Sequence, residues 1–339
     1  MALRTTARVR HLTVAVAAVA ALGLLAGCSG VKNGAAPAGG ESGEAVDFPT
    51  GPIEFQVGAS AGGSTDLLAR ALGAALEEPL GETVTVVNQP GANGAVAAQY
   101  VMGKPADGQT QMLTSGSLIT ITPLFVSEAE AISLDDIQVV TGVGREDYVL
   151  VAHKDSGFTS IDDLVSAGKN INYATAGVGT GGQLSQLLLF DELGIESTDV
   201  PFEGGAPAVT ALLGKQVDVA SVQVLEAMPH IMSGDFVPLA TFGEEPSSFL
   251  DGVETATDQG YDVVVTQSRF VFVPKETPES VVETLEAAYQ EAFANGDYQD
   301  FIANNYIEAD ETDAATTAEN LQAAKDAYEA AAKAAGVID

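Results

Sequence analysis

The chain has 339 residues, of which 46% are hydrophobic and 18% charged, so it is long enough for two globular domains and too apolar to be disordered. Its formal net charge of −33 excludes nucleic acid as a partner, because the phosphate backbone would be repelled. The acidic residues are scattered, and the chain holds only three histidines and one cysteine, so no metal site and no cofactor is predicted.

Residues 1–27 are predicted to be an export signal. Arg4, Arg8 and Arg10 give it a basic start, and the apolar run over residues 12–25 is too short to span a bilayer comfortably. The run ends in Leu-Ala-Gly-Cys, which matches the bacterial lipobox, so we predict cleavage before Cys28 and attachment of a lipid to its thiol. The alternative is a free, buried cysteine that follows an ordinary signal peptide.

Residues 28–47 are predicted to be a lipidated, flexible tether, because glycine, alanine and serine dominate them. Cleavage would remove three arginines and leave 14 − 3 = 11 basic against 47 acidic residues, a charge of 11 − 47 = −36. The lipid would hold the protein, as a monomer, on the outer face of the cytoplasmic membrane, either at a cell surface or in a periplasm.

Strand-like and helix-like segments alternate from residue 52 onward, which predicts an α/β fold with largely parallel sheets. In the first half we expect strands over 53–57, 83–87 and 110–114, and helices over 65–80 and 94–102. Further strands are expected over 149–152, 172–175, 197–202, 217–222, 237–242 and 263–273. Helices are expected over 160–166 and 183–193, from Pro207, and over 278–294 and 314–335.

Two of the strand-to-helix junctions are rich in glycine, at residues 57–66 and 174–182. Each places free backbone N–H groups and the positive end of a helix dipole where an anion can sit. Because the two junctions fall in different halves of the chain, we predict that they form two jaws that hold a carboxylate from both sides. The alternative is that both are only tight turns of an α/β protein.

A serine hydrolase is the alternative function. Gly58-Ala59-Ser60-Ala61-Gly62 matches the G-x-S-x-G nucleophile elbow and lies between a strand and a helix. A hydrolase needs a histidine within reach of Ser60, and the exported chain offers His153, expected in a surface turn, and His230, expected in packing. The elbow also follows the first strand instead of a later one, so the chain is predicted not to be an enzyme.

Many short motifs recur in the order found in the substrate-binding proteins of tripartite tricarboxylate transporters, the TctC or Bug type. From residue 52 to about residue 305 the chain resembles this family through GGSTDLLAR (62–70), NQPGANG (88–94), PADG (105–108), PFEGGAPA (201–208) and LGKQVD (213–218). The resemblance implies a type II periplasmic-binding-protein (Venus-flytrap) fold, whose two lobes have mainly parallel sheets joined by crossing strands. We place lobe 1 at 48–147 plus 268–339 and lobe 2 at 148–267.

The resemblance also implies a function, an extracytoplasmic solute-binding protein that delivers a small carboxylate to a membrane permease with a large and a small subunit. The ligand would be a dicarboxylate, tricarboxylate, amino acid or aromatic acid held mainly by backbone amides and water. Carried over by position, the ligand-binding residues are Ser60, Ala61, Gly62, Gly63, Ser64, Thr65, Asp66, Ser115, Ser117, Ala176, Gly177, Val178, Gly179, Thr180, Gly204 and Gly205.

Some positions depart from the family pattern. Ala61 stands where a proline is common, Glu203 stands where a basic residue is common, and the neutral residues 221–223 replace an acid. Glu203 would repel a second ligand carboxylate, which favours a monocarboxylate or a zwitterion over a tricarboxylate. Arg269 is predicted either to grip the ligand as a bidentate fork or to form a surface or inter-lobe salt bridge.

Overall fold

The computed structural model describes residues 47–338. The predicted signal over 1–27, the lipidation site Cys28 and all of the predicted tether except Asp47 lie outside the described residues. Within residues 47–338, no helix is long and apolar enough to cross a membrane.

The first half of the chain builds a sheet in which three strands run parallel. β1 (Ile53–Val57) lies between β2 (Val84–Asn88) and β3 (Thr110–Ser115), and β3 is followed in the sheet by β9 (Thr266–Pro274), which runs antiparallel. The connections carry α1 (Ser64–Leu80), α2 (Ala95–Met102) and the short α3 (Ser117–Thr120). The predicted strands and helices of this region are confirmed to within two residues at each end.

The middle of the chain builds a second sheet. β5 (Ile171–Thr175) lies between β6 (Ser197–Pro201) and β7 (Val219–Gln223) and is parallel to both. β8 (Phe236–Thr241) pairs with β4 on the other side of this sheet. The helices here are α4 (Ile161–Ser166), α5 (Gly181–Glu192), α6 (Gly205–Leu213) and α7 (Val224–Met232).

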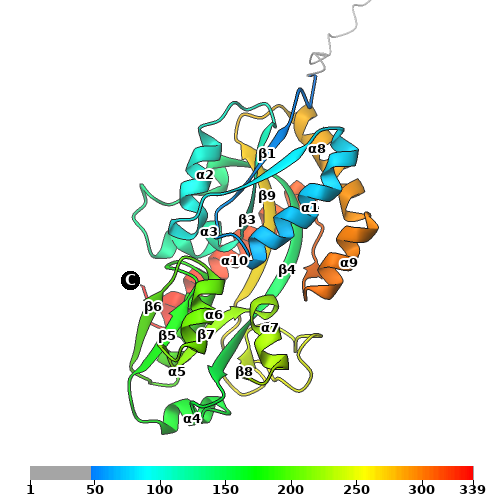
Figure 1. Cartoon of the computed structure of the whole chain (residues 1–339). Helices are drawn as coiled ribbons and strands as arrows, with labels where there is room; N and C mark the ends of the chain where they lie inside the picture. The colour runs from blue at the N-terminus through cyan, green and yellow to red at the C-terminus, as the bar shows by residue number, and fades with distance from the viewer. Residues whose placement is uncertain (1–46, 339) are drawn as a thin grey trace, which may run out of the picture. The chain divides into compact units, whose positions relative to one another are not determined.

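Two long strands run between the two sheets (Figure 1). β4 (Ile137–His153) pairs with β9 through residue 147 and with β7 and β8 from residue 148 onward. The strand predicted over 149–152 is only the last part of β4. The strand predicted over 263–273 begins at Thr266 instead, and His153 is buried at the end of β4, so its placement in a surface turn is wrong.

The C-terminal helices cover the outside of this framework. α8 (Glu279–Phe293) packs on α1, and α9 (Gly296–Asn304) and β10 (Glu308–Ala309) follow it. The final helix α10 (Ala314–Ala334) buries Leu321 in a core cluster with β9 residues and Tyr328 in a cluster with second-sheet residues. The division of the chain between two lobes at residues 147 and 267 stays a prediction.

Candidate functional site

A cavity of about 80 Å³ lies where the carboxyl ends of six strands meet. Its walls come from the segments that follow β1, β2 and β3 in the first sheet and β5, β6 and β7 in the second. In open α/β sheets, ligands bind outside the carboxyl ends of parallel strands. The position of this cavity therefore makes it the candidate ligand site.

Many of the predicted ligand-binding residues line this cavity together. They are Ser60, Gly63, Ser64 and Thr65 from the first jaw, Ala176 and Thr180 from the second, and Ser115, Ser117, Gly204, Gly205 and Arg269. The other predicted residues are not part of the cavity wall, namely Ala61, Gly62, Asp66, Gly177, Val178 and Gly179. The structure thus brings parts of both jaws to one site.

Asp66 shapes the first jaw from behind the cavity wall. Its buried carboxylate accepts hydrogen bonds from the Gly62 amide (2.8 Å) and the Asn88 side chain (2.9 Å) and pairs with Arg70 (2.8 Å). Burial acts to raise the pKa of Asp66, but these hydrogen bonds and the charge of Arg70 together lower it. The carboxylate is therefore occupied within the turn, and it positions the residues before α1.

The glycine amides of the second jaw are used within the turn itself. The Gly177 amide donates to the Thr175 hydroxyl (3.4 Å), and the Gly179 amide donates to the side-chain oxygen of Gln183 (2.8 Å). Both glycines have positive φ angles of 131° and 75°, which an L side chain adopts only with strain. This explains why the turn needs glycine although these two residues do not line the cavity.

The second jaw also contacts the first half of the chain directly. The Gly179 carbonyl accepts hydrogen bonds from the side chains of Asn93 (2.9 Å) and Thr122 (3.1 Å). The Ser60 hydroxyl donates to the Glu203 carbonyl (2.7 Å) across the same gap. Sequence reasoning missed Asn93, although its place in the turn after β2, at the carboxyl end of a strand, was an available signal.

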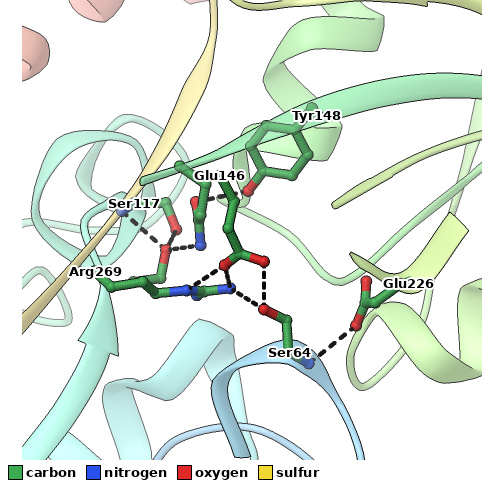
Figure 2. Close-up of polar contacts among 8 residues, drawn as sticks. Ser64, Ser117, Glu146, Tyr148, Glu226 and Arg269 are labelled. Atoms are coloured by element: carbon green, nitrogen blue, oxygen red, sulfur yellow. Dashed lines mark hydrogen bonds and ion pairs between the residues drawn. The ribbon is translucent and has the colours of Figure 1, made fainter. Parts of the chain in front are cut away.

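A buried ion pair connects the two crossing strands behind the cavity (Figure 2). Arg269 on β9 pairs with Glu146 on β4 at 2.7 Å, and their side chains are 2% and 0% exposed. The Ser64 hydroxyl donates to the second oxygen of Glu146 (2.5 Å) and lies 3.1 Å from the Arg269 guanidinium. Of the two roles predicted for Arg269, the structure contains a salt bridge, and it is buried between β4 and β9 instead of at the surface.

Glu226 lies at the start of α7 and faces the first jaw (Figure 2). One carboxylate oxygen, Oε1, accepts a hydrogen bond from the Ser64 amide at 3.4 Å, at the N-terminus of α1. The other oxygen, Oε2, is buried and has no hydrogen-bond partner among the described residues. Burial first, and then the charge of Glu146, raise the pKa of Glu226 to about 7. Sequence reasoning missed this residue because its contact with Ser64 joins positions 162 residues apart and leaves no local pattern.

A network of neutral side chains completes the wall beside β3. The Tyr148 hydroxyl donates to Gln267 (2.7 Å), the Gln267 amide donates to Ser115, and the hydroxyls of Ser115 and Ser117 are 2.5 Å apart. Burial raises the pKa of Tyr148 well above its ordinary range, so the phenol stays neutral. The network ties β3, β4 and β9 together and fixes the two serines at the cavity.

A larger cavity of about 630 Å³ lies against α10. It is bordered by β4, β9 and α10, with Arg145 and Tyr328 in its wall, and it contains no residue of either glycine-rich turn. It shares Ser117 and Arg269 with the smaller cavity, but β3 is the one parallel strand of the described chain whose carboxyl end it reaches, so the smaller cavity fits a ligand site better despite its size.

The geometry gives the hydrolase alternative no support. The Ser60 hydroxyl is hydrogen bonded to the Glu203 carbonyl, whereas a nucleophilic serine needs a base. Among the described residues, His153 accepts from the Asp155 amide through Nδ1, and the His230 ring packs on Phe236. Neither imidazole is a partner of Ser60.

Comparison with known proteins gives consistent matches. A family model described as "Tripartite tricarboxylate transporter family receptor" matches residues 68–336. A UPF0065 protein of Bordetella pertussis is 28% identical over 276 residues, which are 79% of this chain and 84% of that protein. Protein BugT of the same species is 30% identical over 251 residues, 72% of this chain and 77% of BugT.

Solved structures with the same fold include the periplasmic binding protein BugD, with a TM-score of 0.80 and 26% identity over 86% of this chain and 99% of that one. MatC from Rhodopseudomonas palustris with bound malate gives a TM-score of 0.79 and 26% identity, over 84% and 99% of the two chains. An R. palustris protein with adipate gives 0.81 and 25% identity, over 86% and 99%. These likenesses confirm the predicted two-lobe, type II periplasmic-binding-protein fold.

Proposed function

The chain belongs to the family of tripartite tricarboxylate transporter receptors, and we propose on this premise that it is a solute-binding protein which captures a small carboxylate outside the cytoplasm. It then delivers the ligand to the membrane permease of such a transporter and performs no chemistry on it. Related structures with malate and with adipate support a carboxylate as the ligand. Lipid attachment at Cys28 would keep the protein beside the permease.

One observation carries the proposal: a helix that follows a strand of the first sheet and a helix that follows a strand of the second sheet begin at the same small cavity. α1 begins at Ser64 and α6 at Gly205, and both residues line the cavity wall. The first N–H groups of a helix have no partner within the helix, and they carry the positive end of its dipole. A ligand carboxylate beside the two helix ends would accept hydrogen bonds from both sides, from amides other than that of Ser64, which already donates to Glu226.

The size of the cavity favours a small ligand. At about 10–15 Å³ for each water-sized position, its volume of about 80 Å³ holds roughly five to eight such positions. That is the scale of a short-chain carboxylic acid. An aromatic acid or a tricarboxylate would need a wider gap between the two sheets.

Capture would depend on closure of the two halves around the ligand. β4 and β9 connect the halves, while the Asn93–Gly179 and Ser60–Glu203 hydrogen bonds hold the closed arrangement. We propose that a ligand stabilises this arrangement by bridging the helix ends of α1 and α6. The closed form would then present the surface that the permease recognises.

Thermal stabilisation by a panel of short carboxylic acids, including malate and adipate, tests the proposal, because a ligand that binds only the folded protein raises its melting temperature. Gly63→Val should abolish this stabilisation, because Gly63 lines the cavity and its φ of −79° accepts a side chain. Gly51→Val is the matched control, since an added Cβ there meets nothing within 4 Å. Binding that persists in Gly63→Val, or a wild-type protein that binds none of the acids, would contradict the proposal.

A further inference from the structure

We propose that Glu226 is the specificity-determining residue of the cavity and that it selects a ligand with a protonated nitrogen beside its carboxylate. The inference rests on the proposed function, since it concerns which carboxylate the same cavity takes. It starts from the charges on the cavity wall. Arg269 is the one cation among the lining residues of the described chain, and buried Glu146 already neutralises it.

Two acids remain on the wall without a cationic partner, Glu203 and Glu226. Glu203 is exposed, so water solvates its charge. Glu226 is different, because its Oε2 is buried and has no partner within the described residues, while its Oε1 accepts from the Ser64 amide at 3.4 Å and the Gln223 amide also acts on the carboxylate. A buried carboxylate oxygen without a donor is costly, and a ligand that supplies the donor removes this cost.

The position of Glu226 determines where the hydrogen-bond donor of the ligand must lie. Its carboxylate lies between the start of α1, at Ser64, and the start of α6, where a Cβ built on Gly205 would come within 1.8 Å of Oε2. These are the same two helix ends that would hold a ligand carboxylate. A group that reaches Oε2 is therefore close to the ligand carboxylate, as the ammonium of an amino acid is.

Glu226 would reject ligands that carry a second acid at this place. A dicarboxylate with its second group near Oε2 meets a like charge in a poorly solvated site, whereas an ammonium gains a charge-assisted hydrogen bond. Burial first, and then the charge of Glu146, raise the pKa of Glu226 to about 7, and a ligand cation beside Oε2 would oppose both effects. The ligand class is thus a small zwitterion with amino and carboxylate groups on neighbouring positions.

The test uses matched pairs that differ only in nitrogen for oxygen: glycine and glycolate, alanine and lactate, aspartate and malate, with adipate as an amine-free reference. Affinities are measured by titration calorimetry. In the wild-type protein the tightest ligand should be an amino acid, and Glu226→Gln should weaken it by roughly 10- to 150-fold, the value of a hydrogen bond to a charged group. Glu226→Asp, which keeps the charge, should retain part of the preference.

Glu311→Gln is the matched control, because Glu311 also has a buried oxygen without a partner and a pKa raised by burial, but lies outside the cavity. It should leave every affinity unchanged. A tightest ligand without nitrogen, or a preference for nitrogen that survives in Glu226→Gln, would overturn the assignment of Glu226 and leave the proposed function standing. Binding of no acid at all, in the pairs or the wider panel, would overturn both.

Discussion

Replacement of Arg269 by methionine should destabilise the protein strongly. Within residues 47–338, the change leaves the Glu146 carboxylate, which is 0% exposed, with the Ser64 hydroxyl as its one remaining side-chain donor. Removing one partner of a buried ion pair typically costs about 3–5 kcal/mol, because the other charge stays buried without compensation. At about 2–4 °C for each kcal/mol, the melting temperature should fall by roughly 6–20 °C.

Two further variants separate this effect from loss of packing. The double variant Glu146→Gln, Arg269→Met removes both charges and should recover most of the lost stability. Arg145 precedes Glu146 on β4 and forms an exposed ion pair with Glu308 at 3.2 Å. Arg145→Met breaks this pair and should lower the free energy of unfolding by at most about 1 kcal/mol. Melting of all four proteins by circular dichroism decides the matter. If Arg269→Met melts within 2 °C of the wild type, the buried pair does not carry the stability assigned to it.

The remaining predictions concern the cavity. The folded-state pKa of Glu226, about 7, lies above its ordinary value of 4.5, so the fold loses stability as the pH rises through 7 and Glu226 becomes charged. Glu226→Gln should therefore be more stable than the wild type by on the order of 3 kcal/mol at pH 8 and equally stable near pH 4.5. Urea titrations at both pH values measure the difference, and the same difference at both would exclude this effect. Asn93→Gly allows the same positive-φ backbone but removes the side-chain hydrogen bond to the Gly179 carbonyl. Calorimetry should then find the ligand affinity reduced by roughly 2- to 10-fold. An unchanged affinity would show that this hydrogen bond does not hold the closed form. Gly205→Ala places a Cβ 1.8 Å from the present position of Oε2 and should displace the Glu226 side chain. This variant should lose the preference for amino over hydroxy acids with little change in melting temperature. The control Gly51→Ala should keep the preference, because a Cβ there meets nothing within 4 Å.

The first jaw could be predicted from sequence because its signals are local. An alternating apolar strand, a run of glycines and a helical stripe follow one another within residues 53–80, and β1, the turn and α1 form there. The second jaw could be predicted only in part. Its glycines were found, but the side chains of Thr175 and Gln183 take up their amides, and nothing in the sequence indicates which donors a turn keeps for itself.

The other parts of the site could not be predicted from sequence, because they depend on contacts between residues far apart in the chain. Ser64 meets Glu146 and Glu226, which are 82 and 162 positions away, so neither contact leaves a local pattern. The first part of β4 was missed because it contains Gly142, Gly144 and Glu146, which break the apolar pattern of a buried strand. A charge on a buried strand is tolerated there only because β9 brings Arg269 beside it. Helix α9 was missed although Asn295 caps it.

The charge of the whole chain explains why a site of this kind suits the protein. With a formal net charge of −33 the protein repels anions, but at physiological ionic strength the field of each exposed charge decays in solvent over about 8 Å, so distant surface charges act weakly at the cavity. Attraction within the cavity must then come from its own wall, where the Arg269 charge is already neutralised and the helix ends of α1 and α6 supply N–H groups. Amides bind a single carboxylate without requiring that a cation first lose its water. Because Glu226 lies on the same wall, a ligand gains most binding free energy when its second charge is positive. The selectivity of the cavity therefore depends on the net charge of the ligand and not only on its carboxylate.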